Sequence, residues 1–274
     1  MATTQISWTS KDGLKLYART WTSEQAKGVV ALVHGMGEHI DRYDHLANYF
    51  NAAGYSVLGF DHRGHGQSEG KRGHTPNFEA YLDDVEVLLA QTRERFPDLP
   101  IFLYGHSMGG NVVLNYLLQR KPVVKAVITT GPWIKLAFEP NAALVMIGKL
   151  LRNIAPGFTQ DSGLNPQHIA RRTATVDAYK KDPLVHGKIS SAAGIDLMKS
   201  GQWLLTQKGT LPVPTLIQHG ADDQITSPAA SRQFSEQFSG VTYKIWEGLY
   251  HEIHNEDIRE EVYQYTLDWM KKQS

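Results

Sequence analysis

The hydrophobic residues of this 274-residue chain gather in short runs that polar and glycine-containing segments separate. The run at residues 29–33 is continuously apolar, as expected of a strand that is buried on both faces of a parallel sheet. Further strands are predicted at residues 55–60, 101–104, 124–129, 215–219 and 243–246. Near the N-terminus, residues 6–8 and 14–19 flank a turn and predict a hairpin.

Helical patterns lie between these strands. Residues 78–96 carry apolar side chains at spacings of three and four, which predicts an amphipathic helix that ends before Pro97. Other helices are predicted at residues 43–53, at 110–118, and in a closing segment with Ile258, Val262, Tyr265 and Trp269 on one face. This alternation predicts an α/β fold with a mostly parallel, doubly wound sheet and an N-terminal antiparallel hairpin at its edge.

The alternation is interrupted between residues 133 and 208, where helical pieces and turns occur without a strand pattern. We interpret this segment as a helical cap, or lid, that is inserted into the core domain. The predicted core then comprises residues 1–132 and 209–274, and the predicted cap comprises residues 133–208.

The strongest chemical signal is the sequence Gly-His-Ser-Met-Gly at residues 105–109. It follows a predicted strand and precedes a predicted helix, which is the context of a nucleophile elbow. Glycines flank the serine because larger side chains would collide in so sharp a turn. Ser107 is therefore the predicted nucleophile of a serine hydrolase. A second Gly-x-Ser-x-Gly match at residues 66–70 has neither the strand nor the helix, so we interpret it as a loop.

A serine nucleophile needs a histidine base and a carboxylate that orients the base. In such hydrolases the acid precedes the base along the chain, and each follows a strand of the sheet. Asp222 and Asp223 follow the penultimate predicted strand, and His251 and His254 follow the last one. His251 is favoured as the base because it is nearer to the strand end. Spacing alone does not separate the two aspartates.

The oxyanion that develops during acyl transfer needs two hydrogen-bond donors. The backbone N–H of Met108, directly after the nucleophile, is one candidate. The second is the N–H of Met36, in the turn 34–37 that follows an early strand. The segment 251–254, His-Glu-Ile-His, resembles a zinc motif only superficially, because its histidines are three apart in a loop. No metal and no other cofactor is expected.

Composition narrows the choice of partners. The chain has 28 Lys and Arg against 28 Asp and Glu residues, so its formal charge is zero and no nucleic-acid partner is expected. It has no cysteine, which excludes disulfides, thiolate catalysis and cysteine-ligated zinc. No secretory leader and no apolar stretch of membrane-spanning length is visible, so we expect a cytoplasmic protein.

In combination, several segments resemble the monoacylglycerol lipases, a group of serine hydrolases whose members are also labelled lysophospholipases and esterases. The similar segments are residues 34–39, 42–43, 60–70, 105–110, 182–184 and 247–254. The resemblance implies the α/β-hydrolase fold and the hydrolysis of monoacylglycerols to glycerol and fatty acid through an acyl-enzyme. It also implies Ser107, Asp223 and His251 as the catalytic triad, which selects Asp223 from the aspartate pair.

The resemblance further implies that Glu38, Arg42 and His254 contact the glycerol hydroxyls of the substrate. Hydroxyl groups need an acceptor and a donor side by side, which a glutamate and an arginine supply. The alternative is that Glu38 and Arg42, four residues apart at a helix start, simply form an ion pair.

The predicted cap contains a helix, around residues 142–154, that is apolar almost all round. Such a helix is either fully buried or available for contact with lipid. Because it belongs to the insertion over the active-site edge, we favour an acyl-chain tunnel with Leu144, Ile147 and Leu151 as contacts. The cap would then touch a membrane surface transiently, without insertion.

The expected partner is thus a small lipid ester. A lysophospholipase or a broad carboxylesterase would use the same triad, and a serine peptidase of this fold is a further alternative. An intact triad argues against a binding protein without catalytic activity.

Overall fold

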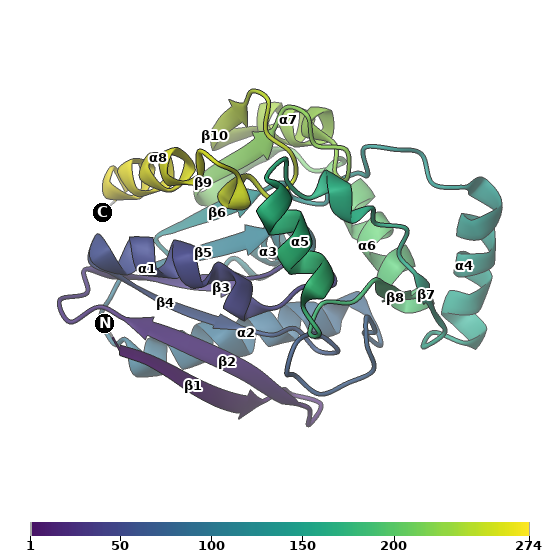
Figure 1. Ribbon diagram of the computed structural model, residues 1–274, viewed down its shortest axis with the longest axis horizontal. Helices are drawn as coiled ribbons and strands as arrows, with labels where there is room; N and C mark the ends of the chain where they lie inside the picture. The colour runs from purple at the N-terminus through teal and green to yellow at the C-terminus, as the bar shows by residue number, and fades with distance from the viewer. Residues whose placement is uncertain (1, 274) are drawn as a thin grey trace.

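The computed structural model describes residues 2–273 and contains an eight-stranded sheet with helices on both faces (Figure 1). The order across the sheet is β1-β2-β4-β3-β5-β6-β9-β10. The bounds are β1 Ala2–Thr9, β2 Lys15–Thr22, β3 Gly28–Val33, β4 Tyr55–Phe60, β5 Ile101–His106, β6 Ala126–Thr130, β9 Gly209–Gly220 and β10 Phe238–Trp246. β2 pairs antiparallel with both β1 and β4, and the other neighbours are parallel. The predicted α/β fold with an antiparallel N-terminal hairpin is thereby confirmed.

The side chains of each buried strand divide the hydrophobic core into two layers. On β3, residues 29, 31 and 33 pack into one cluster, and residues 30 and 32 pack into the other, as the period of two requires. One layer is covered by α2 Phe78–Arg95, α3 Met108–Arg120 and α7 Pro228–Glu236, and the other by α1 Asp44–Ala52 and α8 Arg259–Lys271. Burial of both faces explains why this strand is continuously apolar.

Parallel pairing brings the carboxyl ends of β3, β5, β9 and β10 to one edge of the sheet. The segments that follow these strands therefore open side by side, although they are far apart in the sequence. These are the segments that carry the predicted catalytic residues.

Between β6 and β9 the chain leaves the large sheet. It forms α4 Ala142–Ile154, β7 Thr159–Asp161, a 3-10 helix Pro166–His168, α5 Thr173–Lys181, β8 Lys188–Ser190 and α6 Ser191–Leu204. The expectation that this segment has no strand is wrong, because β7 and β8 pair antiparallel. Each has only three residues, too few to show an alternating pattern. The division into core and cap at residues 133 and 208 stays a prediction.

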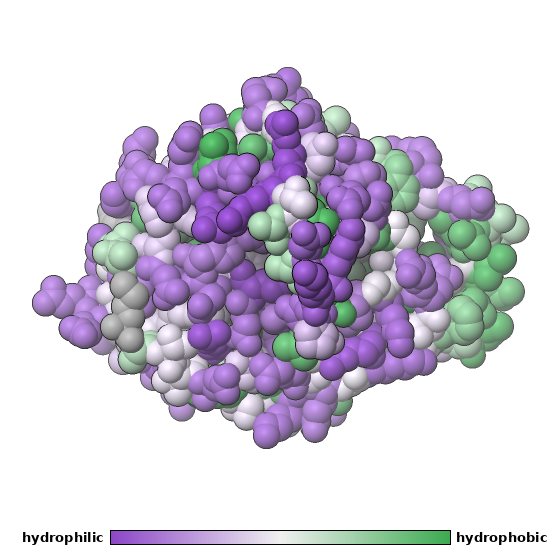
Figure 2. All heavy atoms as spheres, viewed as in Figure 1, coloured by the Kyte–Doolittle hydropathy of each residue, from purple (hydrophilic) through white to green (hydrophobic). Residues whose placement is uncertain are grey.

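Helix α4 lies at the periphery of the molecule, beside α6 (Figure 1). None of its residues is buried, and Met146 and Ile154 are 67% and 69% exposed. Figure 2 shows the hydrophobic surface that results over this helix. The alternative of a fully buried helix is thus wrong. Among residues 2–273, no helix is both long enough and apolar enough to cross a bilayer.

Several element boundaries differ from the prediction, and the starts of β10 and α8 are two of them. β10 begins at Phe238, because its pairing with β9 continues through an irregularity between Ser239 and Val241. α8 begins at Arg259, so Ile258 precedes the helix and is 37% exposed instead of belonging to the apolar face.

Candidate active site

Ser107 occupies the turn between β5 and α3. Its backbone angles are φ 52° and ψ −116°, a strained conformation for a residue other than glycine. The N–H of Ser107 donates to the carbonyl of Thr130 over 3.0 Å, and its carbonyl accepts from the N–H of Trp133 over 2.9 Å. These two bonds hold the residue in the geometry of a nucleophile elbow.

The glycines of the elbow are required by close backbone contacts. A Cβ atom on Gly105 would lie 2.6 Å from the carbonyl oxygen of Gly109, and one on Gly109 would lie 2.2 Å from that of Val33. Both oxygens belong to the main chain of a regular element and cannot move aside freely. Residues with side chains are therefore excluded at positions 105 and 109, two before and two after the serine.

The second Gly-x-Ser-x-Gly match has a different environment, as expected. The hydroxyl of Ser68 donates to the carbonyl of Asp61 over 2.6 Å and accepts from the N–H of Tyr17 over 2.9 Å. It therefore stabilises its own loop against strand β2.

The structure brings together an acid that follows β9 and a base that follows β10. His251 Nδ1 lies 2.7 Å from Asp223 Oδ2, so the ring N–H can donate to the carboxylate. The other carboxylate oxygen accepts the N–H groups of Ile225 at 2.7 Å and Thr226 at 3.0 Å. The N–H of Asp222 donates to the carbonyl of Leu249, in the segment after β10, over 3.0 Å. Of the two aspartates, it is Asp223 that meets the imidazole.

The pairing of these two groups shifts both of their pKa values. Burial alone would raise the pKa of Asp223, but His251 and hydrogen bonds from two histidines hold it far below its usual range. Burial alone would lower the pKa of His251, yet the charge of Asp223 and the hydrogen bond to it raise the pKa above 6.5. The acid therefore stays ionised and increases the proton affinity of the base.

Two further side chains contact Asp223 and were not foreseen from the sequence. His219 Nε2 lies 2.9 Å from Asp223 Oδ2, and His219 Nδ1 lies 2.9 Å from the hydroxyl of Ser231. The Thr226 hydroxyl lies 2.9 Å from the same carboxylate oxygen and 3.0 Å from the carbonyl of Gly131. His219 lies four residues before Asp223 and Thr226 lies three residues after it. These spacings could indicate contacts with the acid only after Asp223 had been identified as the acid.

Ser107 and His251 both lie against the segment 130–133. Ser107 is bonded to both ends of this segment, and a Cβ atom on Gly131, in its middle, would lie 3.1 Å from His251 Nδ1. The ring of His106, which precedes the serine, lies 4.8 Å from the ring of His251. Because Nδ1 faces the carboxylate, Nε2 is the ring nitrogen that can accept the serine proton.

The turn after β3 lies directly beside Ser107. A Cβ atom on Gly35 would be 3.2 Å from the Cβ of Ser107, and the N–H of Gly35 donates to Glu38 Oε1 over 2.7 Å. Met36 follows in this turn, and Met108 is the first residue of α3, where backbone N–H groups lack an intrahelical acceptor. The two predicted oxyanion donors thus belong to segments that flank the serine, and their role stays a prediction.

Glu38 and Arg42 form the ion pair that was the alternative to a glycerol contact. Arg42 donates to Glu38 Oε2 at 2.7 Å and to the two carboxylate oxygens of Glu252 at 2.8 and 2.7 Å. Burial raises the pKa of Glu38. Burial would also raise the pKa of Glu252, but Arg42 lowers it to about 2. The three charges form a buried network behind the turn that carries Met36.

His254 is also buried, with 1% of its surface exposed. Its ring stacks on Tyr43 at 4.9 Å and lies edge-on to His106 at 4.6 Å, and burial lowers its pKa well below 6.5. His254, Glu38 and Arg42 are not among the described residues that line the cavity at Ser107. Contact between these three residues and glycerol stays a prediction that this placement does not favour.

A cavity of about 540 Å³ opens at Ser107. Its apolar walls include Met36, Trp133, Leu136, Phe138, Leu164, Ile189 and Ile225. A mostly apolar cavity of this size suits a small molecule with a hydrophobic tail. Among residues 2–273, its lining does not include the predicted tunnel contacts Leu144, Ile147 and Leu151, because α4 presents Val145 and Met146 to a different cavity. No group of three or more His, Cys, Asp or Glu side chains in the same range could hold a metal ion.

Comparisons with known proteins agree with this geometry. Residues 24–258 match the model of the family described as serine aminopeptidase, S33. A monoacylglycerol lipase of Mycolicibacterium smegmatis is 34% identical over 268 residues, which are 96% of this chain and 95% of that protein. An uncharacterized abhydrolase domain-containing protein of Dictyostelium discoideum is 39% identical over 96% of this chain, which spans 28% of the length of that relative. The crystal structure of a monoacylglycerol lipase from Paleococcus ferrophilus is similar at a TM-score of 0.86 and 32% identity, covering 94% of this chain and 99% of that one.

Proposed function

We propose that this chain, which belongs to the family described as serine aminopeptidase, S33, hydrolyses monoacylglycerols to glycerol and free fatty acid. The observation that carries the proposal is the Asp223–His251 contact of 2.7 Å beside the Ser107 elbow, at an apolar cavity. The family description names a peptidase, but the relatives and solved structures called monoacylglycerol lipases support an ester substrate with an acyl chain.

The reaction begins with transfer of the serine proton. His251 Nε2 accepts the proton of the Ser107 hydroxyl, while the Asp223 carboxylate holds Nδ1 and stabilises the imidazolium. The serine oxygen then attacks the ester carbonyl. The backbone N–H groups of Met36 and Met108 stabilise the negative oxygen of the tetrahedral intermediate.

The second half of the reaction releases both products. The imidazolium of His251 returns its proton to the departing glycerol oxygen as the C–O bond breaks, which leaves the acyl group on Ser107. Water, deprotonated by His251, attacks this acyl-enzyme, and His251 returns that proton to the Ser107 oxygen as its bond to the acyl group breaks and the fatty acid leaves. No other reactant is needed, because water supplies both the hydroxyl group and the proton.

Labelling of the serine tests the assignment of the nucleophile. A fluorophosphonate reacts covalently with an activated serine, so the wild-type chain should be labelled and Ser107→Ala should not. Ser68→Ala is the matched control, because it removes the serine of the second motif and should leave labelling intact. Ser107→Ala should retain only the acceleration of binding and oxyanion stabilisation, roughly 10³–10⁴ over water. Full activity in Ser107→Ala would contradict the proposal.

A substrate panel separates the proposed substrate from its alternatives. Values of kcat/KM on monoolein, lysophosphatidylcholine and a fatty acyl anilide compare a glycerol ester, a lysophospholipid and an amide. We expect the largest value for monoolein. A larger value for lysophosphatidylcholine would indicate a lysophospholipase, and one for the anilide would indicate a peptidase-like amide hydrolase.

We also propose that residues 133–208 act as a cap that touches lipid through α4. Leu150 and Ile154 are 60% and 69% exposed, and apolar residues on such a surface are typical of interaction sites. Replacing both by glutamate should lower binding to lipid vesicles and the rate on vesicle-bound monoolein, but not the rate on a water-soluble short-chain ester. Val123→Glu is the control, since Val123 is 85% exposed at the opposite edge of the sheet, just before β6. A cytoplasmic location stays a prediction from the sequence.

A further inference from the structure

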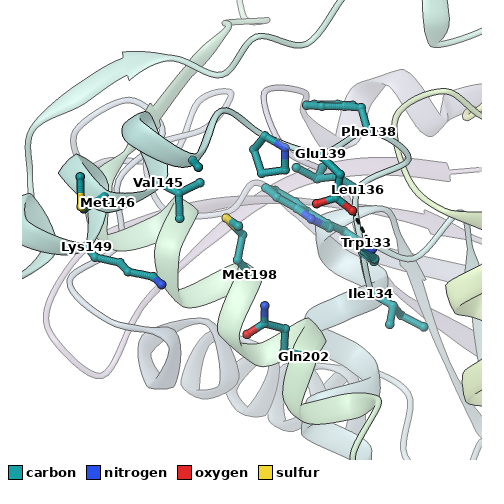
Figure 3. Close-up of a pocket in the computed structure, with 13 residues that line it drawn as sticks. Trp133, Ile134, Leu136, Phe138, Glu139, Val145, Met146, Lys149, Met198 and Gln202 are labelled. Carbon is teal, nitrogen blue, oxygen red and sulfur yellow. Dashed lines mark ion pairs between the residues drawn. The ribbon is translucent and has the colours of Figure 1, made fainter.

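A second cavity, of about 480 Å³, lies between the segment 133–140, α4 and α6. Figure 3 shows Trp133 on one side of it, Val145 and Lys149 projecting from α4, and Met198 and Gln202 projecting from α6. Most of the lining is apolar, so the cavity can accept a hydrocarbon chain.

The charges around this cavity do not balance. Lys135 and Glu139 both line it and pair with each other at 2.9 Å. Lys149 lines it as well, but takes part in none of the ion pairs recorded within residues 2–273. In Figure 3 the Lys149 side chain extends from α4 towards α6, where the amide of Gln202 lies. The cavity therefore combines an apolar body with one unbalanced positive charge and a neighbouring amide donor.

The second cavity shares a wall with the cavity at Ser107. Trp133, Leu136 and Phe138 line both, and the N–H of Trp133 is bonded to the Ser107 carbonyl at 2.9 Å. The two cavities are therefore neighbours, separated by these three side chains.

We infer that the second cavity binds a long-chain fatty acid in its carboxylate form. Lys149 and Gln202 hold the carboxylate, and Trp133, Val145 and Met198 pack against the hydrocarbon chain. The inference rests on the proposed function, because this fatty acid is the product that the hydrolysis releases. Lys149 is exposed at the mouth of the cavity, and a carboxylate can form a charge-assisted hydrogen bond with its ammonium, which a neutral glyceride cannot. Methionine side chains adapt to chains of differing shape.

Binding to the second cavity can be measured separately once the catalytic cavity is blocked. The serine is first labelled with a long-chain alkyl phosphonate, and binding of oleate is then measured by competition against a fatty acid that carries a photoreactive diazirine. We expect the labelled enzyme to bind about one oleate, with crosslinks that map to α4, α6 and residues 133–140. Lys149→Glu should weaken oleate binding about tenfold, which corresponds to about 1.4 kcal/mol. Oleyl alcohol, which has the same chain without the charge, should bind more weakly by a similar factor.

Lys199→Glu is the matched control for the charge change. Lys199 follows Met198 on α6 but lines a different cavity with Asn77 and Asp196, so oleate affinity should change less than about twofold. Equal losses in the two variants, equal affinity for oleyl alcohol, or absence of binding after phosphonate labelling would each overturn the inference. If the phosphonate does not label Ser107, the proposed function fails instead, and binding of oleate to the unlabelled protein still tests the second cavity.

Discussion

Replacement of Glu38 by glutamine alters one atom behind the turn that carries Gly35 and Met36. Glu38 Oε1 accepts from the N–H of Gly35 and the hydroxyl of Tyr43, each at 2.7 Å, and Oε2 accepts from Arg42 at 2.7 Å. Glutamine keeps a carbonyl oxygen for the first two donors but places an amide N–H against the guanidinium. We therefore expect the turn to be held less firmly, without being released.

The size of the effect follows from these bonds. A hydrogen bond to a charged group contributes about 1.5–3 kcal/mol and one between neutral groups about 0.5–1.5 kcal/mol, so the turn loses roughly 1–1.5 kcal/mol of restraint. If this restraint positions an oxyanion donor, kcat should fall about tenfold. Arg42 keeps both bonds to Glu252, so the free energy of unfolding should fall by only about 1–3 kcal/mol.

Two substrates distinguish a positioning role of Glu38 from a glycerol contact. Monoolein and the p-nitrophenyl ester of oleic acid share the acyl chain, but only monoolein carries glycerol. If Glu38 positions the turn, kcat falls by the same factor for both esters and KM changes little. An increase of KM for monoolein, with unchanged rates for the nitrophenyl ester, would refute this reasoning and support the glycerol contact. Denaturant unfolding of Glu38→Gln verifies that the variant is folded.

Two other predictions concern the base and the elbow. Because Asp223 raises the pKa of His251 against the effect of burial, kcat/KM should fall on the acid side with a midpoint above pH 6.5, as the base becomes protonated; a pH–rate profile with a lower midpoint would contradict this. Gly109→Ala places a Cβ atom 2.2 Å from the Val33 carbonyl and should destabilise the fold by about 1–3 kcal/mol. In Gly157→Ala the nearest atom is 3.8 Å away, so thermal unfolding should show a much smaller loss.

The elements that the sequence predicts best are those whose pattern has one explanation. A continuously apolar run such as residues 29–33 is compatible with burial on both faces, and parallel pairing then requires the segments after the strands to share an edge. This is why Ser107 and His251, 144 positions apart by subtraction of their numbers, could be expected at one site. The choice between Asp222 and Asp223 needed the resemblance, because adjacent residues of a tight turn differ only in the direction of their side chains.

The buried polar network around the site could not be predicted in the same way. Arg42 bonds to Glu252, which is 210 positions away, and no local pattern indicates such a partner. The spacing between Glu38 and Arg42 was compatible with both an ion pair and a hydroxyl site. In the structure the burial of this pair favours the ion pair, since a carboxylate that is already paired inside the protein has little capacity left for a substrate hydroxyl.

The packing of helix α4 could not be predicted from its apolar pattern either. A helix that is apolar all round does not specify which face packs, so Leu144, Ile147 and Leu151 were as reasonable a lining as any other set. The packed face is set by contacts from α6. Ile195 is close enough to Gly148 to contact a Cβ atom there at 3.3 Å, and Arg152 pairs with Asp196 at 2.8 Å. With that face turned to α6, the adjacent face, with Val145 and Lys149, borders the second cavity, and the remaining apolar residues of α4 stay exposed.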